Sequence, residues 1–284
     1  RGWVRADPMA ALAYASSQPN GRWEPSIALA AWAGNDAAAA ERWALDNHQG
    51  DGPNPWMASV IRGIAAYDIA HASQLAEAMP FGRERAEAVD AITRALFVQG
   101  TDAAMAFPAS IQDPQLRAGF VAEIAGRLAA KDPEQAATWL ASNGDAESQN
   151  RASRRVAEAL AQQDPAAAAK WLPTLAASAQ TEAARGIIPI MSAGDVSNIT
   201  DTAKWVSSLA GLPNYDRVVE EFVWSCDQRA PEQSAAWIQG ISDPAQQTRL
   251  YHRMLGGWAR RDAEAVKAWV AANDVPNSVA NRFR

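Results

Sequence analysis

The chain has 284 residues, with 26 Lys and Arg against 32 Asp and Glu and a single cysteine. One cysteine excludes an intrachain disulfide scaffold, and no apolar run reaches the roughly 18 residues of a membrane span, so no membrane insertion is expected. The formal net charge of -6 argues against nucleic acid as a partner, since a phosphate backbone calls for a basic surface.

A short motif recurs along the chain at a nearly constant spacing. In its clearest copy, Asp132-Pro133 is followed by Ala136 and Trp139, four and seven residues after the aspartate. We call the aspartate, or the residue in its place, the anchor. The nine anchors are residues 7, 36, 68, 100, 132, 164, 198, 230 and 262. Such a regular period predicts a repeat architecture.

The motif has a direct physical meaning. Aspartate is a preferred N-cap and proline suits the first helical position, so a helix is expected to begin at each anchor. The small residue at plus four and the aromatic at plus seven lie three positions apart, on one face of that helix. The 65 alanines and 12 tryptophans are therefore largely positional, and the aromatic column is predicted to be core.

Each anchor is preceded by a second apolar stripe. Residues eight and four before the anchor, such as Val156 and Leu160 before Asp164, are mostly large and apolar. Positions four apart share one face of a helix. Each unit of about 32 residues is thus predicted to be an αα-hairpin, which must stack on its neighbours to bury its stripe.

The pattern resembles the tetratricopeptide-like superfamily of αα-hairpin superhelices, including its Sel1-like variants. The likeness lies in a large residue, a turn residue, a small residue and an aromatic, as in Leu128, Asp132, Ala136 and Trp139. The resulting expectation is an all-α fold, a right-handed αα-superhelix of about nine hairpins forming one solenoid over residues 1–284. The resemblance implies a scaffold that binds a protein or an extended peptide in its concave groove.

The two ends and one proline modify this expectation. The first unit is predicted to lack its first helix, and residues 275–284 to open a further unit. Pro189 falls inside a predicted helix and indicates a bend near residues 186–200. We interpret the chain as part of a longer polypeptide. The absent initiator methionine and the low lysine content favour an extracytoplasmic, periplasmic location over a cytoplasmic one.

Arginines form the strongest functional pattern. Thirteen residues before four consecutive anchors stand Arg151, Arg185, Arg217 and Arg249. The candidate groove residues are these four together with Arg155, Glu221, Trp224 and Arg253. Guanidinium groups repeating once per hairpin can bind carboxylates or phosphates bidentately, so the expected partner is a protein or an acidic or extended peptide, in a groove centred on residues 151–253.

A structural reading of the same column stays open. Each arginine could instead brace its own hairpin by pairing with a carboxylate or a helix C-terminus. Reversing the charge of Arg185 and Arg217 would separate the two readings: loss of a partner from a folded protein favours the groove, and unfolding favours the brace.

Few residues of the chain stand in a pattern typical of catalysis or metal binding. His48, His71 and His252 lack metal-ligand spacing, and Cys226 has no nearby histidine partner and reads as a small buried hydrophobe. Glu220 and Glu221 point about 100° apart on a helix and cannot share one site. We predict no cofactor, no metal and no enzyme activity. Gly256-Gly257 is expected to permit close helix packing.

Two alternatives remain, a non-catalytic superhelical domain of a larger enzyme acting on cell-wall glycan and an α/α-toroid enzyme. Three tryptophans, Trp23, Trp56 and Trp224, do not stand seven residues after an anchor and are therefore outside the aromatic column. They are candidates for stacking against a ligand.

Overall fold

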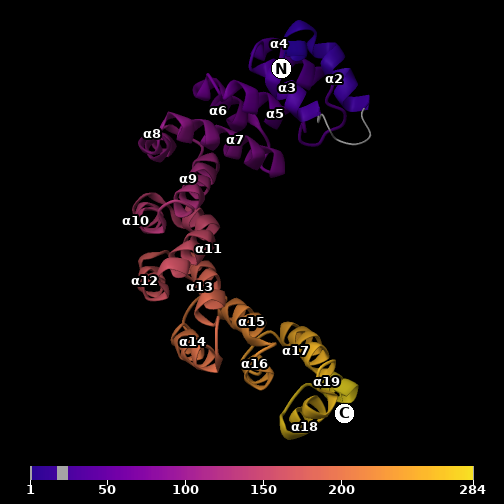
Figure 1. The fold of residues 1–284 in the computed structure, drawn as a ribbon, viewed down its shortest axis with the longest axis vertical. Coiled ribbons are helices and arrows are strands. Elements are labelled where there is room, and N and C mark those ends of the chain that lie inside the picture. The colour runs from indigo at the N-terminus through magenta and orange to yellow at the C-terminus, as the bar shows by residue number, and fades with distance from the viewer. Residues whose placement is uncertain (1, 18–24, 284) are drawn as a thin grey trace. The chain divides into compact units, whose positions relative to one another are not determined.

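The computed structural model describes residues 2–17 and 25–283, except for the side chain of Arg5, so the prediction for Trp23 lies outside it. Within those ranges the chain forms nineteen α-helices, two short 3₁₀ segments and no β-strand (Figure 1). The all-α prediction is confirmed. The chain divides into two compact units, residues 1–124 (unit 1) and 125–284 (unit 2).

Unit 1 begins with short helices and ends within a long one. Its elements are α1 (Gly2–Ala6), α2 (Pro8–Ser17), α3 (Pro25–Ala33), α4 (Ala37–Asp46), α5 (Met57–Ile64), α6 (Ile69–Ala78), α7 (Arg83–Gln99), α8 (Thr101–Ala106), the 3₁₀ segment Phe107–Ser110 and most of α9 (Pro114–Ala129).

Unit 2 follows from the last turns of α9. Its elements are α10 (Pro133–Asn143), α11 (Ala146–Gln163), α12 (Pro165–Trp171), the 3₁₀ segment Leu172–Thr174, α13 (Ala177–Met191), α14 (Val196–Ser208), α15 (Tyr215–Cys226), α16 (Pro231–Ile238), α17 (Pro244–Ala259), α18 (Ala263–Ala272) and α19 (Asn277–Phe283).

The aspartate anchors cap helices as predicted. Asp36, Asp68, Asp132 and Asp262 each accept a hydrogen bond from the backbone N–H three residues on, at 2.9 to 3.0 Å. Each bond satisfies one of the N–H groups that a helix start leaves without a partner. The repeat period therefore places these helix starts correctly.

One anchor is wrong. The helix assigned to Asn198 begins earlier, at Val196, because Asp195 caps it by accepting from the backbone N–H of Ser197 and Asn198. The preceding helix α13 runs on two residues past Pro189. Gly194 adopts a φ of 101° in the intervening turn, a conformation that glycine takes without a steric penalty.

The residues four and seven positions after each anchor differ in how deeply they are buried. The small residues at plus four are buried in all nine copies, from Ala11 to Val266. The aromatic column is only partly core, since Trp139 and Trp171 are buried, the other tryptophans of the column are half-buried and Tyr14 is 45% exposed. A helix packed on one neighbour covers the base of a long aromatic side chain more fully than its tip, and an indole keeps an N–H that needs a partner.

Helices alternate within each unit. In unit 1, α3 packs on α5 and α5 on α7; in unit 2, α11 packs on α13 and α13 on α15. The intervening helices pack beside them, and Figure 1 shows α10, α12 and α14 along one side of α11, α13 and α15. Helix α19 contacts α17 and α18, just as α13 contacts α11 and α12.

Successive hairpins are also tied at their turns. The residue before an anchor reaches back to a carbonyl oxygen of the preceding turn: Tyr67 donates to Ala33 (3.0 Å), Arg229 to Gly194 (3.0 Å) and Arg261 to Asp227 (3.2 Å). Sequence reasoning missed these links because the donor is a tyrosine in one copy and an arginine in the other two.

Candidate functional site

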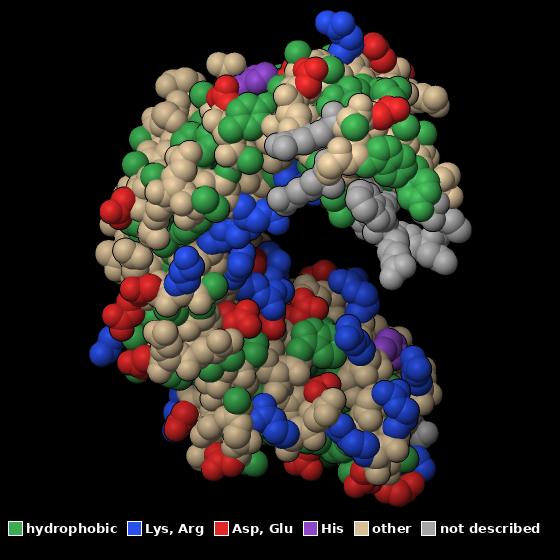
Figure 2. Space-filling view, turned by 45° about the horizontal axis from the view of Figure 1, so that its top comes forward, with side chains coloured by type: hydrophobic (Ala, Val, Ile, Leu, Met, Phe, Trp, Pro, Cys, Tyr) green, Lys and Arg blue, Asp and Glu red, His purple; other side chains and the backbone are tan. Residues whose placement is uncertain are grey.

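Polar side chains gather on the helices α11, α13, α15 and α17 of unit 2. These four helices carry all eight predicted groove residues. We call this set of side chains, with the partners described below, the polar strip. Figure 2 shows a group of basic side chains with acidic side chains directly beside it.

The centre of the strip is an ion-pair network around two glutamates. Glu221 on α15 pairs with Arg185 on α13 (3.2 Å) and with Arg154 on α11 (3.3 Å). Glu182 on α13 pairs with Arg185 (3.0 Å) and with Arg217 on α15 (2.7 Å). Three arginines and two glutamates leave the network with one net positive charge.

Burial divides the members of this network. The side chains of Glu182 and Glu221 are each 14% exposed and that of Arg185 is 17% exposed, whereas Arg154 and Arg217 are 45% and 49% exposed. Carboxylates that have lost most of their water need paired partners. Arg185 is therefore committed to bracing α13 against α15, and the two outer arginines close the network from the solvent side.

Close packing of α11 against α13 makes the ion pair between Arg154 and Glu221 possible. Gly186 on α13 lies against the backbone of α11, where a Cβ would collide with the carbonyl oxygen of Arg154. The absence of a side chain lets the two helices approach, and Arg154 then reaches past α13 to Glu221. The sequence pattern missed Arg154 and Glu182. Glu182 could have been found from its i,i+3 spacing to Arg185.

A surface hollow of about 270 Å³ lies between α15 and α17. Its lining residues are Glu220, Trp224, Gln246, Arg249, Leu250 and Arg253. We call it the α15–α17 hollow. It brings together three predicted groove residues, Trp224, Arg249 and Arg253, from two successive hairpins. Glu220 faces this hollow while Glu221 faces the network, which confirms that the two adjacent glutamates serve different sites.

The contacts inside this hollow are specific. The guanidinium carbon of Arg253 lies 3.9 Å from the centre of the Trp224 ring. The indole Nε1–H of Trp224 donates to Oε1 of Glu220 (3.4 Å), and the amide of Gln246 donates to Oε2 (3.1 Å). Among the described residues, neither Arg249 nor Arg253 forms an ion pair.

The remaining predicted residues lie at the other end of the strip. Arg151 pairs with Glu147 of its own helix (2.6 Å). Arg155 lines a hollow of about 280 Å³ with Glu158, Gln162 and the end of α9. Its guanidinium rests on Gly126, where a Cβ would come within 2.6 Å of Nη1. The structure thus distributes the predicted set over two hollows, a central network and one intrahelical pair.

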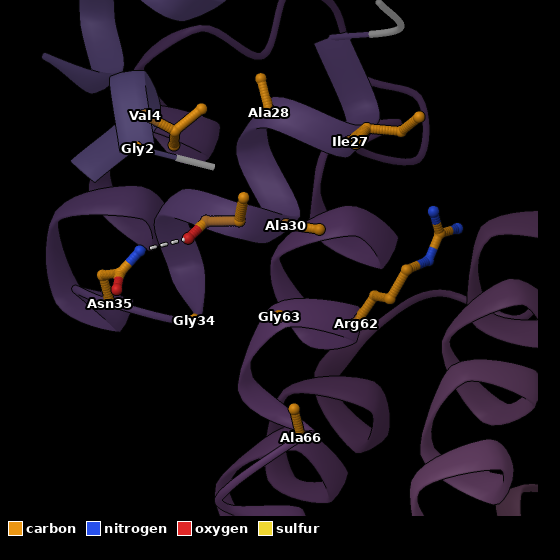
Figure 3. A pocket seen from close by; sticks show the side chains of 11 residues that line it. Gly2, Val4, Ile27, Ala28, Ala30, Gly34, Asn35, Arg62, Gly63 and Ala66 are labelled. Carbon is orange, nitrogen blue, oxygen red and sulfur yellow. Dashed lines mark hydrogen bonds between the residues drawn. The ribbon is translucent and has the colours of Figure 1, made fainter. Parts of the chain in front are cut away.

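Unit 1 holds a larger hollow of different chemistry. It has a volume of about 750 Å³ and is lined by Gly2, Val4, Ile27, Ala28, Ala30, Ala31, Gly34, Asn35, Arg62, Gly63 and Ala66 (Figure 3). The Nε of Arg62 is buried and has no hydrogen-bond partner. The amide of Asn35 donates to the carbonyl oxygen of Ala31 (2.7 Å). Sequence reasoning did not find this hollow, because alanines and glycines carry no chemical signal.

The remaining candidates from the sequence have structural surroundings. Trp56 packs edge-on against Trp43, with ring centres 5.5 Å apart. Cys226 is fully buried, and burial raises the pKa of its thiol to about 11, so it stays protonated at neutral pH. His71 lies 3.2 Å from Glu41, and His48 contacts the carbonyl oxygen of Gly52.

No group of three or more His, Cys, Asp or Glu side chains in the part of the chain that the structure describes is placed to hold a metal ion. None of the helices described is both long enough and apolar enough to span a bilayer.

Comparison of the chain with protein-family models, with curated proteins and with solved structures gives no match in any of the three.

Proposed function

We propose that the chain is a non-catalytic helical-repeat scaffold that binds an extended peptide segment of a protein along the polar strip. In this proposal the hairpins form a right-handed, tetratricopeptide-like superhelix, with α11, α13, α15 and α17 along its concave side. The peptide is acidic in character.

The observation that carries the proposal is a difference between repeats. The position thirteen before the anchor holds arginine only in the four hairpins of unit 2. The same position holds Trp23, Pro55, Glu87 and Gly119 in the copies before these, yet α5, α7 and α9, the first helices of the last three of those copies, form and α5 packs on α7. Stacking of the hairpins therefore does not require arginine there. A charged feature that the fold does not need is a candidate for recognition.

The strip also combines rigidity with unused hydrogen-bonding capacity. The network of Glu182, Arg185 and Glu221 fixes neighbouring helices, while Arg155, Arg249 and Arg253 flank it without forming ion pairs among the described residues. Arginines held on rigid elements lose little conformational entropy when they bind a carboxylate, which favours affinity.

Selection from a random linear-peptide display library tests the proposal. We expect the chain to enrich peptides rich in Asp and Glu, with binding that weakens as salt rises. A variant with Arg155, Arg249 and Arg253 changed to glutamate should lose these peptides. Its matched control changes Arg42, Lys170 and Arg260 to glutamate, three exposed cations away from the strip.

Two results would contradict the proposal. One is the absence of any enriched peptide with the folded wild-type chain. The other is equal loss of binding in the strip variant and the control variant, which would mean that net charge alone governs binding. Circular dichroism melts of all three proteins verify that folding is preserved.

A further inference from the structure

We infer that the α15–α17 hollow is a receptor for a single carboxylate, supplied by an aspartate or glutamate side chain of the bound peptide, and that Arg249 and the stacked Arg253 are the groups that hold it. This inference rests on the proposed function and assigns the recognition step to one of the two hollows in the strip.

Stacking on Trp224 holds the guanidinium of Arg253 in a position where it can bind such a ligand. At 3.9 Å from the ring centre, its guanidinium contacts the face of Trp224, and this contact uses no hydrogen bond. The N–H donors of a guanidinium lie in its plane and stay available for bidentate pairing with a carboxylate. The ring thus fixes the position of the cation without consuming its donors.

The acidic residue in the wall does not neutralise the arginines by direct pairing. Both carboxylate oxygens of Glu220 accept bonds from neutral N–H groups, those of Trp224 and Gln246. The same bonds hold the indole in place beneath Arg253. Glu220 therefore positions the stack, and the hollow as a whole carries two arginines against one glutamate, which gives one net positive charge.

Size and charge together define the ligand. A hollow of about 270 Å³ is smaller than most cofactor or nucleotide sites, which span about 300–1,000 Å³. Its buried wall residue Leu250 offers an apolar contact for methylene groups. One net positive charge matches one carboxylate, whereas a phosphate dianion would leave an excess negative charge beside Glu220.

The central arginines are excluded from this role by their existing partners. Arg185 is shared between Glu182 and Glu221, and Arg217 pairs with Glu182 at 2.7 Å. A ligand carboxylate would have to compete with a nearly buried one for these guanidiniums. The arginine column therefore combines both readings open at the sequence level, a brace at Arg185 and a receptor at Arg249.

Fluorescence anisotropy with labelled oligo-glutamate, and with oligo-glutamine as the uncharged control, tests the assignment on the whole chain. We expect oligo-glutamate alone to bind, and the double variant Arg249→Gln/Arg253→Gln to bind it about tenfold or more weakly, as for loss of a charge-assisted pair. Arg260→Gln, which changes an exposed arginine at the end of the same helix, should change the affinity less than about threefold.

A second readout reports on the hollow itself. The indole N–H signal of Trp224, identified by its loss in Trp224→Phe, should shift in a ¹⁵N–¹H NMR spectrum when oligo-glutamate is added. Arg253→Lys keeps the charge but loses the planar guanidinium group that stacks on Trp224 and donates paired hydrogen bonds. This variant should therefore bind oligo-glutamate more weakly than wild type.

Several results would overturn the inference. If a peptide from the library binds but oligo-glutamate does not, or if the double variant binds oligo-glutamate as wild type does, the receptor assignment is wrong and the proposed function stands. If inorganic phosphate displaces oligo-glutamate far more effectively than acetate, the hollow is a phosphate site instead. If no peptide of any kind binds, both the proposed function and this inference fail.

Discussion

The unit 1 hollow and the polar strip of unit 2 differ in the side chains that lie beside similar contacts between packed helices. In both units a glycine allows close approach: Gly63 lies against the carbonyl oxygen of Ala30, and Gly186 against that of Arg154. In unit 1 the surface beside this contact is mostly alanine and glycine and stays open as a hollow. In unit 2 the long charged side chains of Arg154 and Glu221 pair across the surface beside this contact. The hairpin scaffold thus determines helix spacing and leaves the surface chemistry to be set locally.

The two units also use ion pairs differently. In unit 1, Arg85 on α7 pairs with Asp113, and the Arg85 side chain is only 9% exposed. In unit 2 each buried glutamate has two arginine partners. A single pair has no substitute when one member is removed, whereas a network retains some of its bonds. The predictions below test this contrast, beginning with the largest expected effect.

Asp113→Asn should be the most damaging of the substitutions considered. It removes the partner of a buried arginine, at a cost of about 3 kcal/mol, the lower end for a buried pair because Asp113 is 24% exposed. Asparagine still caps the helix start, so the cap of α9, formed with the N–H of Gln115, is preserved. Hydrogen exchange measured by mass spectrometry should show faster exchange in α7 and α9. Asp132→Asn is the matched control, since Asp132 caps α10 and forms no ion pair with any residue that the structure describes, and it should have almost no effect.

The same pair makes unit 1 sensitive to acid. The hydrogen bond from Arg85 lowers the pKa of Asp113 below its usual value. A carboxyl group whose pKa is lower in the folded state contributes stability above its unfolded pKa, and loses it as pH falls through the folded value. The protection of the α7 and α9 amides, taken relative to the intrinsic exchange rate at each pH, should therefore fall in acid in wild type and change much less in Asp113→Asn. An identical acid response in both proteins would exclude the pair as its source.

Gly186→Ala should cost about 2 kcal/mol, because the new methyl group collides with backbone rather than with a movable side chain. A Cβ at Gly63 would meet the carbonyl oxygen of Ala30 and would also lie 2.7 Å from Cβ of Ala33 and 2.9 Å from the backbone nitrogen of Gly34. These contacts are tighter than those at Gly186, but Ala30, Gly34 and Gly63 all line the unit 1 hollow, so their helices have room to separate. We expect the smaller loss at Gly63. Chemical denaturation of both variants measures the difference, and a larger loss at Gly63 would mean that the hollow gives no room for adjustment.

Glu221→Gln tests whether the network keeps most of its stabilising effect after one of its glutamates is neutralised. It weakens the bonds to Arg154 and Arg185, but Arg185 keeps Glu182, so a loss of about 1.5 kcal/mol is expected, less than for Asp113→Asn. Chemical denaturation of Glu221→Gln beside Asp113→Asn gives the comparison. A loss as large as that of Asp113→Asn would show that the network behaves as a single pair.

Gly256→Ala should have the smallest effect and the opposite sign. A Cβ at Gly256 meets nothing within 4 Å, and at Gly257 only Arg260 lies near, at 3.9 Å. The expectation that this glycine pair permits close packing is therefore wrong. Replacing glycine in the interior of α17 with alanine should stabilise the protein by about 0.5–1 kcal/mol, seen as a higher denaturation midpoint. A loss would indicate a contact made by α17 outside this structure.

The sequence predicts local features of this protein better than long-range ones. Cap residues such as Asp36 and Asp132 were predictable because the bond they accept is three residues away. The start of α14 was not, because Asp195 competes with the repeat register. The pairing of Arg154 with Glu221, 67 residues apart, depends on the rotation and separation of three helices. The column of arginines lies on the helices that carry the ion-pair network, but which side chains pair with one another follows only from packing.

The ion pair between Arg154 and Glu221 spans more than neighbouring helices. It links α11 to α15, over α13, although stacked repeats ordinarily couple only to nearest neighbours. Packed helix axes lie about 8–10 Å apart, so a bond from the first helix to the third draws their polar faces together. Because Arg154 is 45% exposed and exposed charges are screened by ions, this link between the first and the third of the three helices should weaken as ionic strength rises.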